Sequence, residues 1–192
     1  MNNSRHLITA SLAFFLVCAG CKPNPVAQQY QKDGVQFTYY SDWKIAKDAP
    51  AKGNANVRAI HIEGPHNAVV SLICEPVLSP QSLEEFAAAV AERRGAAIES
   101  KLSVGSLKTA TVNKGTSEPN LGNVAGRQRP GIFQRFSVDM LGTQVLHEAR
   151  FYAVEGSKYK IMVMAQVAVN NIEETRQGFD LILTSLSVDG MH

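Results

Sequence analysis

Two histidines and a glutamate lie close together in the chain and have the chemistry to hold a metal ion. His61 and Glu63 are two residues apart in a segment with strand character, so both side chains point to one face, and His66 follows after a Gly-Pro turn. Imidazole and carboxylate groups are common ligands of zinc and related metals. Three such residues without a further ligand cluster make a weak signal, and solvated residues at a sheet edge explain the same spacing. We therefore expect no metal site and no cofactor.

The sequence carries no signature of nucleophilic or phosphate chemistry. It has no Gly-x-Ser-x-Gly elbow and no glycine-rich loop of the Walker or dinucleotide type. Cys74 lies in the apolar run 68–77 without an identifiable base, so we expect a buried, unreactive thiol. We expect Trp43 to be a core residue and His147 to be a buried or half-buried imidazole with its hydrogen bonds satisfied. On these grounds we predict no catalytic residues.

The strongest chemical signal is at Cys21. A polar, basic start precedes the apolar run 7–17, and the small residues Ala19 and Gly20 come directly before Cys21. Residues 7–20 make only about 20 Å of helix, too short for a bilayer core of about 30 Å. It resembles a bacterial lipoprotein signal, in which the sulfur of Cys21 receives a diacylglycerol and cleavage makes this residue the first. Cys18 stands where such signals usually have leucine.

An ordinary secretory signal, cut near the same place and leaving a free thiol at Cys21, is the alternative. We favour the lipoprotein because residues 22–31 are polar and contain two prolines, as expected of a flexible tether. Two or more acyl chains would anchor the protein stably in its membrane. By analogy with lipoprotein sorting in Gram-negative bacteria, Lys22 after the modified cysteine indicates the periplasmic face of the outer membrane.

We divide the chain into a leader (1–20), a flexible tether (21–33) and one folded domain (34–189). Its 192 residues, 45% of them hydrophobic and 19% charged, have the composition of one globular domain. Of the 19 lysines and arginines only Arg5 lies in the leader, which leaves 18 against 17 acidic residues. This near-neutral balance gives no reason to expect a nucleic acid as partner. One unmodified cysteine would remain, so no disulfide is expected.

The first half of the domain predicts a meander of strands followed by a helix. Segments rich in β-branched, aromatic and other apolar residues predict strands over 35–40, 43–46, 57–63, 67–77 and 98–112. Ser82 and Glu85 form a capping-box pattern, in which each side chain satisfies an amide of the first helical turn. We expect this helix to end at Gly95.

Residues 114–131 are rich in glycine and proline, and we predict mainly a long loop there, with a short strand near 121–125. Long loops inside compact domains are often functional, so this segment is the first place to look for a binding surface. Arg127, Arg129 and Arg135 form a modest basic group around it. These arginines could meet lipid headgroups or an acidic partner, although a solvated surface explains them better.

The C-terminal part predicts a strand pair and a helix. Strands are expected over 132–140, 144–154 and from 158 onward. Gly156-Ser157 suits a two-residue type II′ turn, which would place Phe151 opposite Met162 and His147 opposite Gln166. Both faces of this pair carry apolar side chains, so we expect a sheet that is covered on both sides. The last helix is predicted to begin after the cap Asn170 and to present one apolar stripe to the sheet.

The order of these elements, together with the sequence Tyr39-Tyr40-Ser41-Asp42-Trp43, resembles the PsbP-like family over most of residues 33–188. Members typically have proline where this chain has Ser41. The resemblance implies an α+β fold, in which helices pack on an antiparallel β-sheet as an α/β/α sandwich. It implies no activity, because the extrinsic PsbP subunit of photosystem II, a Ran-binding import factor and many small bacterial lipoproteins share the fold without sharing a function.

These observations predict a lipid-anchored protein of the bacterial cell envelope that acts as a non-enzymatic binding or interaction module. The membrane, contacted through the lipid at Cys21, and an envelope protein are the expected partners. A small-molecule or metal-binding lipoprotein is the alternative. A hydrolytic enzyme is a weaker one, and it would need His61, Glu63 and His66 in one cleft.

Overall fold

A computed structural model describes residues 24–101, 103–104, 107–108, 110–140 and 142–190. The leader and Cys21 lie outside the described residues. The elements are β1 (Ala27–Lys32), β2 (Val35–Tyr40), β3 (Lys44–Ala51), β4 (Asn54–Glu63), η1 (Pro65–Asn67), β5 (Val69–Pro76), α1 (Leu83–Lys101), β6 (Ser103–Val104), β7 (Leu107–Lys108), β8 (Ala110–Val124), β9 (Arg127–Met140), β10 (Thr143–Glu155), β11 (Tyr159–Ala168), η2 (Val169–Asn171), α2 (Ile172–Ser185) and β12 (Ser187–Val188).

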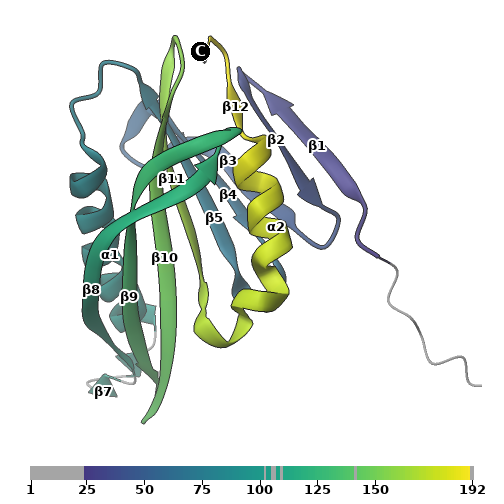
Figure 1. Cartoon of the computed structure of the whole chain (residues 1–192). Helices are drawn as coiled ribbons and strands as arrows, with labels where there is room; N and C mark the ends of the chain where they lie inside the picture. The colour runs from purple at the N-terminus through teal and green to yellow at the C-terminus, as the bar shows by residue number, and fades with distance from the viewer. Residues whose placement is uncertain (1–23, 102, 105–106, 109, 141, 191–192) are drawn as a thin grey trace, which may run out of the picture.

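The main sheet is antiparallel and has seven strands in the order β3-β4-β5-β11-β10-β9-β8. A second, three-stranded sheet has the order β1-β2-β12. Helix α1 lies on one face of the main sheet, and α2 with the small sheet lies on the other (Figure 1). The predicted α+β class, an antiparallel sheet with helices packed on it, is confirmed.

Each face of the main sheet has its own hydrophobic core. Phe151 and Tyr152 are neighbours in β10 and point to opposite faces, yet they are only 0% and 2% exposed. Phe151 packs edge-on against Phe86 of α1, with ring centroids 5.9 Å apart. Tyr152 belongs to the core under α2, together with Ile182. The predicted cover on both sides is therefore confirmed.

Helix α1 begins as predicted and ends later than predicted. The Ser82 amide donates to Glu85 Oε2 at 2.9 Å, and the Glu85 amide donates to Ser82 Oγ at 3.1 Å, which is the expected capping box. The predicted stop at Gly95 is wrong, because the helix continues to Lys101. An internal glycine disfavours a helix by only about 1 kcal/mol, and the alanines and long side chains around it favour the helix.

The predicted loop over 114–131 is wrong. These residues belong to β8 and β9, which form a long hairpin whose turn has positive φ at Ala125 and Gly126. Pro119 is tolerated because β8 is the edge strand of the sheet, where every second N–H has no neighbouring strand to bind. A Cβ atom on Gly122 or Gly131 would lie within 2.5 Å of Tyr152 side-chain atoms. The glycines thus make room for a buried ring.

The β10–β11 hairpin has a different register from the predicted one. Phe151 pairs with Met164, and His147 with Ala168, so both partners are shifted by two residues. Glu155 pairs with Lys160, which leaves four residues in the turn where two were predicted. Gly156 lies against β12, where an added Cβ would come within 2.6 Å of Val188 Cγ1. The slip is even, so every side chain keeps the predicted face.

The first strand begins earlier in the chain than predicted. Residues 27–32, expected to belong to the tether, form β1 and pair with all of β2. Asp33 and Gly34 form the predicted turn, both with positive φ. At the other end of the domain, α2 begins after Asn171 and not after the predicted cap Asn170, and no side chain caps it.

Trp43 is a core residue, as predicted, and is 4% exposed. Its indole packs between two glycines: a Cβ on Gly64 or Gly178 would lie within 2.5 Å of indole atoms. The ring of Phe179 contacts it edge-on at a centroid distance of 5.2 Å. Gly178 therefore allows α2 to approach the sheet closely, although glycine disfavours the helix itself.

We predict that Gly178→Ala destabilises the protein by about 1–3 kcal/mol, because the added methyl overpacks a rigid indole. In an exposed helix the same change would stabilise by about 1 kcal/mol. Urea unfolding followed by circular dichroism measures the difference. Gln177→Ala, on the exposed side of α2, is the control and should change stability little. A Gly178→Ala protein as stable as the wild type would contradict the packing argument.

Candidate functional site

The predicted lipidation residue Cys21 lies outside the described residues, but the structure shows how the chain behind it is held. The Val26 amide donates to Ser41 Oγ at 3.0 Å, and the Ser41 amide donates to the Val26 carbonyl at 2.8 Å. The strand pairing of β1 follows directly. Only residues 22–26 therefore separate Cys21 from the first strand, so the tether is much shorter than predicted.

The three residues with metal-binding chemistry each have a different partner. His61 Nδ1 lies 2.8 Å from Ser71 Oγ, and Glu63 forms an ion pair with Lys44. His66 contacts Glu174 of α2. Within the described ranges no three His, Cys, Asp or Glu residues are grouped as metal ligands would be. Burial lowers the pKa of His61, and Lys47 lowers it further, so this imidazole is neutral at pH 7.

The basic group around the predicted loop is spread along β9. Arg135 forms an ion pair with Glu148 at 2.8 Å, and Arg129 Nε donates to the Val124 carbonyl at 3.1 Å. Arg127 and Arg135 are eight residues apart on one strand, which corresponds to about 26 Å. The three arginines therefore do not form a single anion-binding surface.

His147 is half-buried, but its hydrogen bonds are not satisfied as predicted. The ring stacks on Phe136 with centroids 5.2 Å apart, and Nδ1 is buried without a partner among the described residues. Burial lowers the pKa of His147, and Arg94 lowers it further. The two-residue shift of the hairpin places Ala168, which has no polar side chain, where Gln166 was expected.

Cys74 is buried, as predicted, and is 2% exposed. Burial raises the pKa of its thiol to about 11. The thiolate that would act as a nucleophile is therefore scarce at neutral pH.

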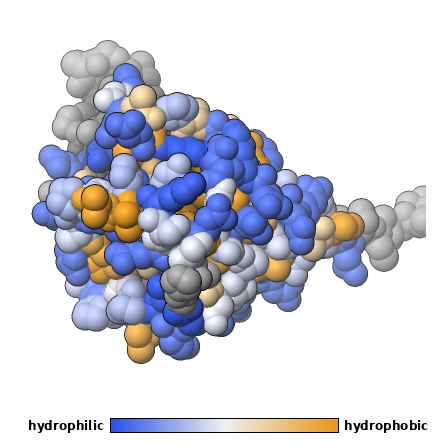
Figure 2. Space-filling view, turned by 90° about the horizontal axis from the view of Figure 1, so that it is seen from above, coloured by the Kyte–Doolittle hydropathy of each residue, from blue (hydrophilic) through white to orange (hydrophobic). Residues whose placement is uncertain are grey.

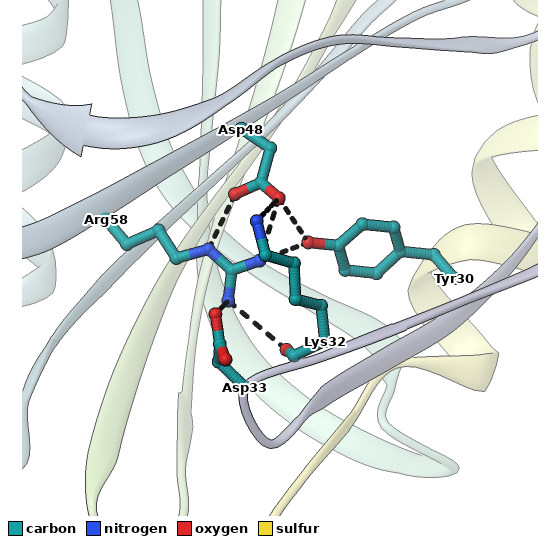
Figure 3. Close-up of polar contacts among 5 residues, drawn as sticks. All are labelled: Tyr30, Lys32, Asp33, Asp48 and Arg58. Atoms are coloured by element: carbon teal, nitrogen blue, oxygen red, sulfur yellow. Dashed lines mark hydrogen bonds and ion pairs between the residues drawn. The ribbon is translucent and has the colours of Figure 1, made fainter.

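The most highly connected polar group in the described structure is a cluster that sequence analysis missed. It joins Tyr30 and Lys32 of β1 and Asp33 of the following turn to Asp48 of β3 and Arg58 of β4 (Figure 3). We call these five residues the β1 clamp. They connect the small sheet, through its first strand, to the edge of the main sheet.

Asp48 is the acceptor at the centre of the β1 clamp. Its carboxylate receives hydrogen bonds from Arg58 Nε at 2.6 Å, Arg58 Nη2 at 3.0 Å, Lys32 Nζ at 2.7 Å and the Tyr30 hydroxyl at 2.9 Å (Figure 3). Arg58 Nη1 donates to the Lys32 carbonyl at 3.2 Å and lies 3.2 Å from Asp33 Oδ2. Arg58 Nη2 also donates to the Tyr30 hydroxyl.

The electrostatics of the β1 clamp follow from these contacts. The hydrogen bonds from Arg58 hold the pKa of Asp48 well below its usual range. Burial and the hydrogen bond to Asp48 raise the pKa of Tyr30. A crevice of about 590 Å³ borders the clamp and is also lined by Cys74 and Tyr159. Because two carboxylates balance two cations, the clamp is suited to fasten β1 and has no excess charge for a ligand.

One signal in the sequence indicates part of this cluster. Arg58 alternates with Ile60 and Ile62 in the same strand, so its charge lies on the face that carries the core. Buried charges require partners, which predicts an acidic residue facing Arg58. Nothing in the sequence identifies that residue as Asp48, because the partner depends on the register of β3 and β4.

Comparison with known proteins finds structural similarity only. No protein-family model and no curated protein sequence matches the chain. The solution structure of cyanobacterial PsbP (CyanoP) from Synechocystis sp. PCC 6803 aligns with 89% of this chain and 98% of its own, at 16% identity and a TM-score of 0.48. LpqN, involved in cell envelope biogenesis of Mycobacterium tuberculosis, aligns with 86% of this chain and 92% of its own, at 9% identity and a TM-score of 0.39.

We predict that Asp48→Asn lowers the free energy of unfolding by about 2 kcal/mol at pH 7, because Arg58 loses the nearer of its two charged partners. The pKa of Asp48 is lower in the folded than in the unfolded protein, so the stabilisation is present above pH 4 and fades as the pH falls further. The difference in stability between wild type and variant should therefore shrink steadily as the pH falls below about 4. Urea titrations at several pH values measure this.

Glu173→Gln is the matched control for this charge removal. Its carboxylate pairs with Arg176 on the exposed surface of α2, so its loss should change stability by less than about 0.5 kcal/mol. An Asp48→Asn effect no larger than the Glu173→Gln effect would show that the clamp does not fasten β1.

Proposed function

We propose that the protein is a lipid-anchored module of the bacterial cell envelope, acylated at Cys21, and that it binds a partner without catalysing a reaction. Ala19 and Gly20 before Cys21 support the anchor. The observation that carries the proposal is the short connection from Cys21 to the β1 clamp. A lipid at Cys21 would pull on the first strand, and the clamp fastens that strand to the main sheet.

A lipid attached to Cys21 would hold the domain close to the bilayer. Six peptide steps from Cys21 to Ala27 span at most about 20 Å. From Ala27, β1 runs toward the top of the molecule in Figure 1, which is the end that Figure 2 shows. Polar side chains dominate that face, and apolar ones are scattered in small groups (Figure 2). A surface of this kind suits the end of an anchored protein that faces the aqueous periplasm.

Lys22 after the modified cysteine supports the outer membrane as the destination, with the domain on its periplasmic side. Among the helices of the described residues, none has both the length and the apolar composition needed to cross a bilayer. The proposed role is that of an interaction module, with an envelope protein as one class of partner.

We predict that Cys21→Ala moves the protein from the membrane fraction to the soluble fraction, because no acyl chain is then attached. Cell fractionation with immunoblotting measures the distribution, and labelling with radioactive palmitate reports acylation directly. Cys18→Leu, which restores the leucine usual in such signals, is the control and should remain labelled and membrane-bound. Membrane retention of Cys21→Ala, or a wild-type protein without label, would disprove the anchor.

A further inference from the structure

Arg94 is a charged residue on the sheet-facing side of α1, and none of the described residues supplies a counter-charge for it. Phe86, Val90 and Arg94 recur every four residues, so they lie along one side of the helix, which faces the sheet. The Arg94 Nη2 atom is buried and has no hydrogen-bond partner among the described residues. In the same part of the chain, no carboxylate lies within ion-pair distance of its guanidinium.

Such an arrangement is unusual because a buried charge destabilises a protein unless a partner neutralises it. Burial lowers the pKa of Arg94 to about 10, so the guanidinium still carries its charge at neutral pH. The guanidinium carbon lies 3.8 Å from the ring centroid of Phe136, which gives a cation–π contact. A hydrogen bond to the unpaired Gln134 Oε1 would satisfy one N–H group but would leave the charge.

A groove opens beside Arg94, between α1 and strands β4, β5 and β11, with a volume of about 390 Å³. Its lining is mostly apolar and includes the side chains Ile73, Phe86, Val90 and Met164. Arg94 also borders a smaller cavity of about 150 Å³ toward β8 and β9. The Arg94 side chain thus borders both spaces, and its guanidinium stacks on Phe136, which lines the smaller one.

The charges around this groove are mainly positive. Arg93 lines it and is exposed at the surface of α1. Lys47 lies near His61 at the opposite wall and lowers the pKa of that imidazole. Glu63, which acts on the same imidazole, is already paired with Lys44. An anion entering the groove therefore meets cations and no unpaired carboxylate among these groups.

We propose that this groove binds a single-chain fatty acid, with its carboxylate paired to Arg94 and its alkyl chain along the apolar wall. A guanidinium binds a carboxylate through two parallel hydrogen bonds. The single charge of a carboxylate is balanced by the one guanidinium of Arg94. A volume of about 390 Å³ is at the lower end of ligand pockets, which favours one chain over two.

The proposal is independent of lipid attachment at Cys21, because acyl chains there would be esters or amides without a charged head. It adds a ligand site to the α1 face of the sheet, whereas the β1 clamp lies at the opposite face.

The test measures binding of radioactive dodecanoate by equilibrium dialysis to the full chain in phosphatidylcholine nanodiscs, with empty nanodiscs as the blank. We expect saturable binding of one dodecanoate per chain. Dodecanol, which has the same chain without the charge, and butanoate, which has the charge without the chain, should each compete at least tenfold more weakly.

Arg94→Met should reduce dodecanoate affinity at least tenfold, because the charge-assisted hydrogen bonds are lost. The ligand-free Arg94→Met protein should melt at least about 2 °C higher than the wild type, because an unpaired buried charge is removed. Dodecanoate should raise the melting temperature of the wild type and not of the variant. Arg127→Met, at an exposed arginine on the β8–β9 hairpin, is the control and should bind as the wild type does.

Several results would overturn the proposal. Equal competition by dodecanol would indicate an apolar groove without an anion site, and equal competition by butanoate an anion site without a chain site. No saturable binding, unchanged binding by Arg94→Met, or a ligand-free Arg94→Met protein that melts no higher than the wild type would each rule out a carboxylate partner for Arg94.

Discussion

The attachment of the first strand depends on the neutralisation of one charge. Arg58 occupies a position on the core-facing side of β4, in line with Ile60 and Ile62. Its guanidinium needs acceptors in a place that water does not fully reach, and Asp48 and Asp33 provide them. Tyr30 and Lys32 complete the shell around Asp48, so neutralising Arg58 also fixes β1 against the main sheet.

Arg94 is also a partly buried charge that needs an acceptor, but the described residues give it none. Both arginines interrupt an apolar face, one of a strand and one of a helix. Arg58 is surrounded by oxygen atoms of its own chain, whereas Arg94 has an aromatic ring on one side and an open groove beside it. The described residues neutralise Arg58 and supply no anion to Arg94, which gives the two positions different roles. The first is structural, and the second is suited to a ligand.

Helices and strands were predicted well where apolar and capping residues recur at a regular spacing in the sequence. The capping box at Ser82 and Glu85 depends on residues three apart, so sequence alone located it. The errors share a cause in tertiary contacts. In the sequence, Gly122 and Gly131 suggest a loop. In the structure, the Tyr152 ring occupies the space that a Cβ atom at either position would need. The polar residues 27–32 indicate a tether, yet they form β1 because Tyr30 and Lys32 find partners on distant strands. The candidate sites depend on the same long-range contacts. The sequence therefore shows that Arg58 and Arg94 lie on apolar faces, but it does not show which residues are their partners.

The two faces of the main sheet are linked through its central strands. Phe151 belongs to the core under α1 and Tyr152 to the core under α2, so consecutive residues of β10 hold both layers. Tyr152 also accepts a hydrogen bond from Asn120 at 2.8 Å, which fastens the edge strand β8 over the same core. Close packing against both faces of these strands leaves the sheet little room to bend. This rigidity allows one face to fasten the strand that follows the proposed anchor while the other keeps an open groove beside α1.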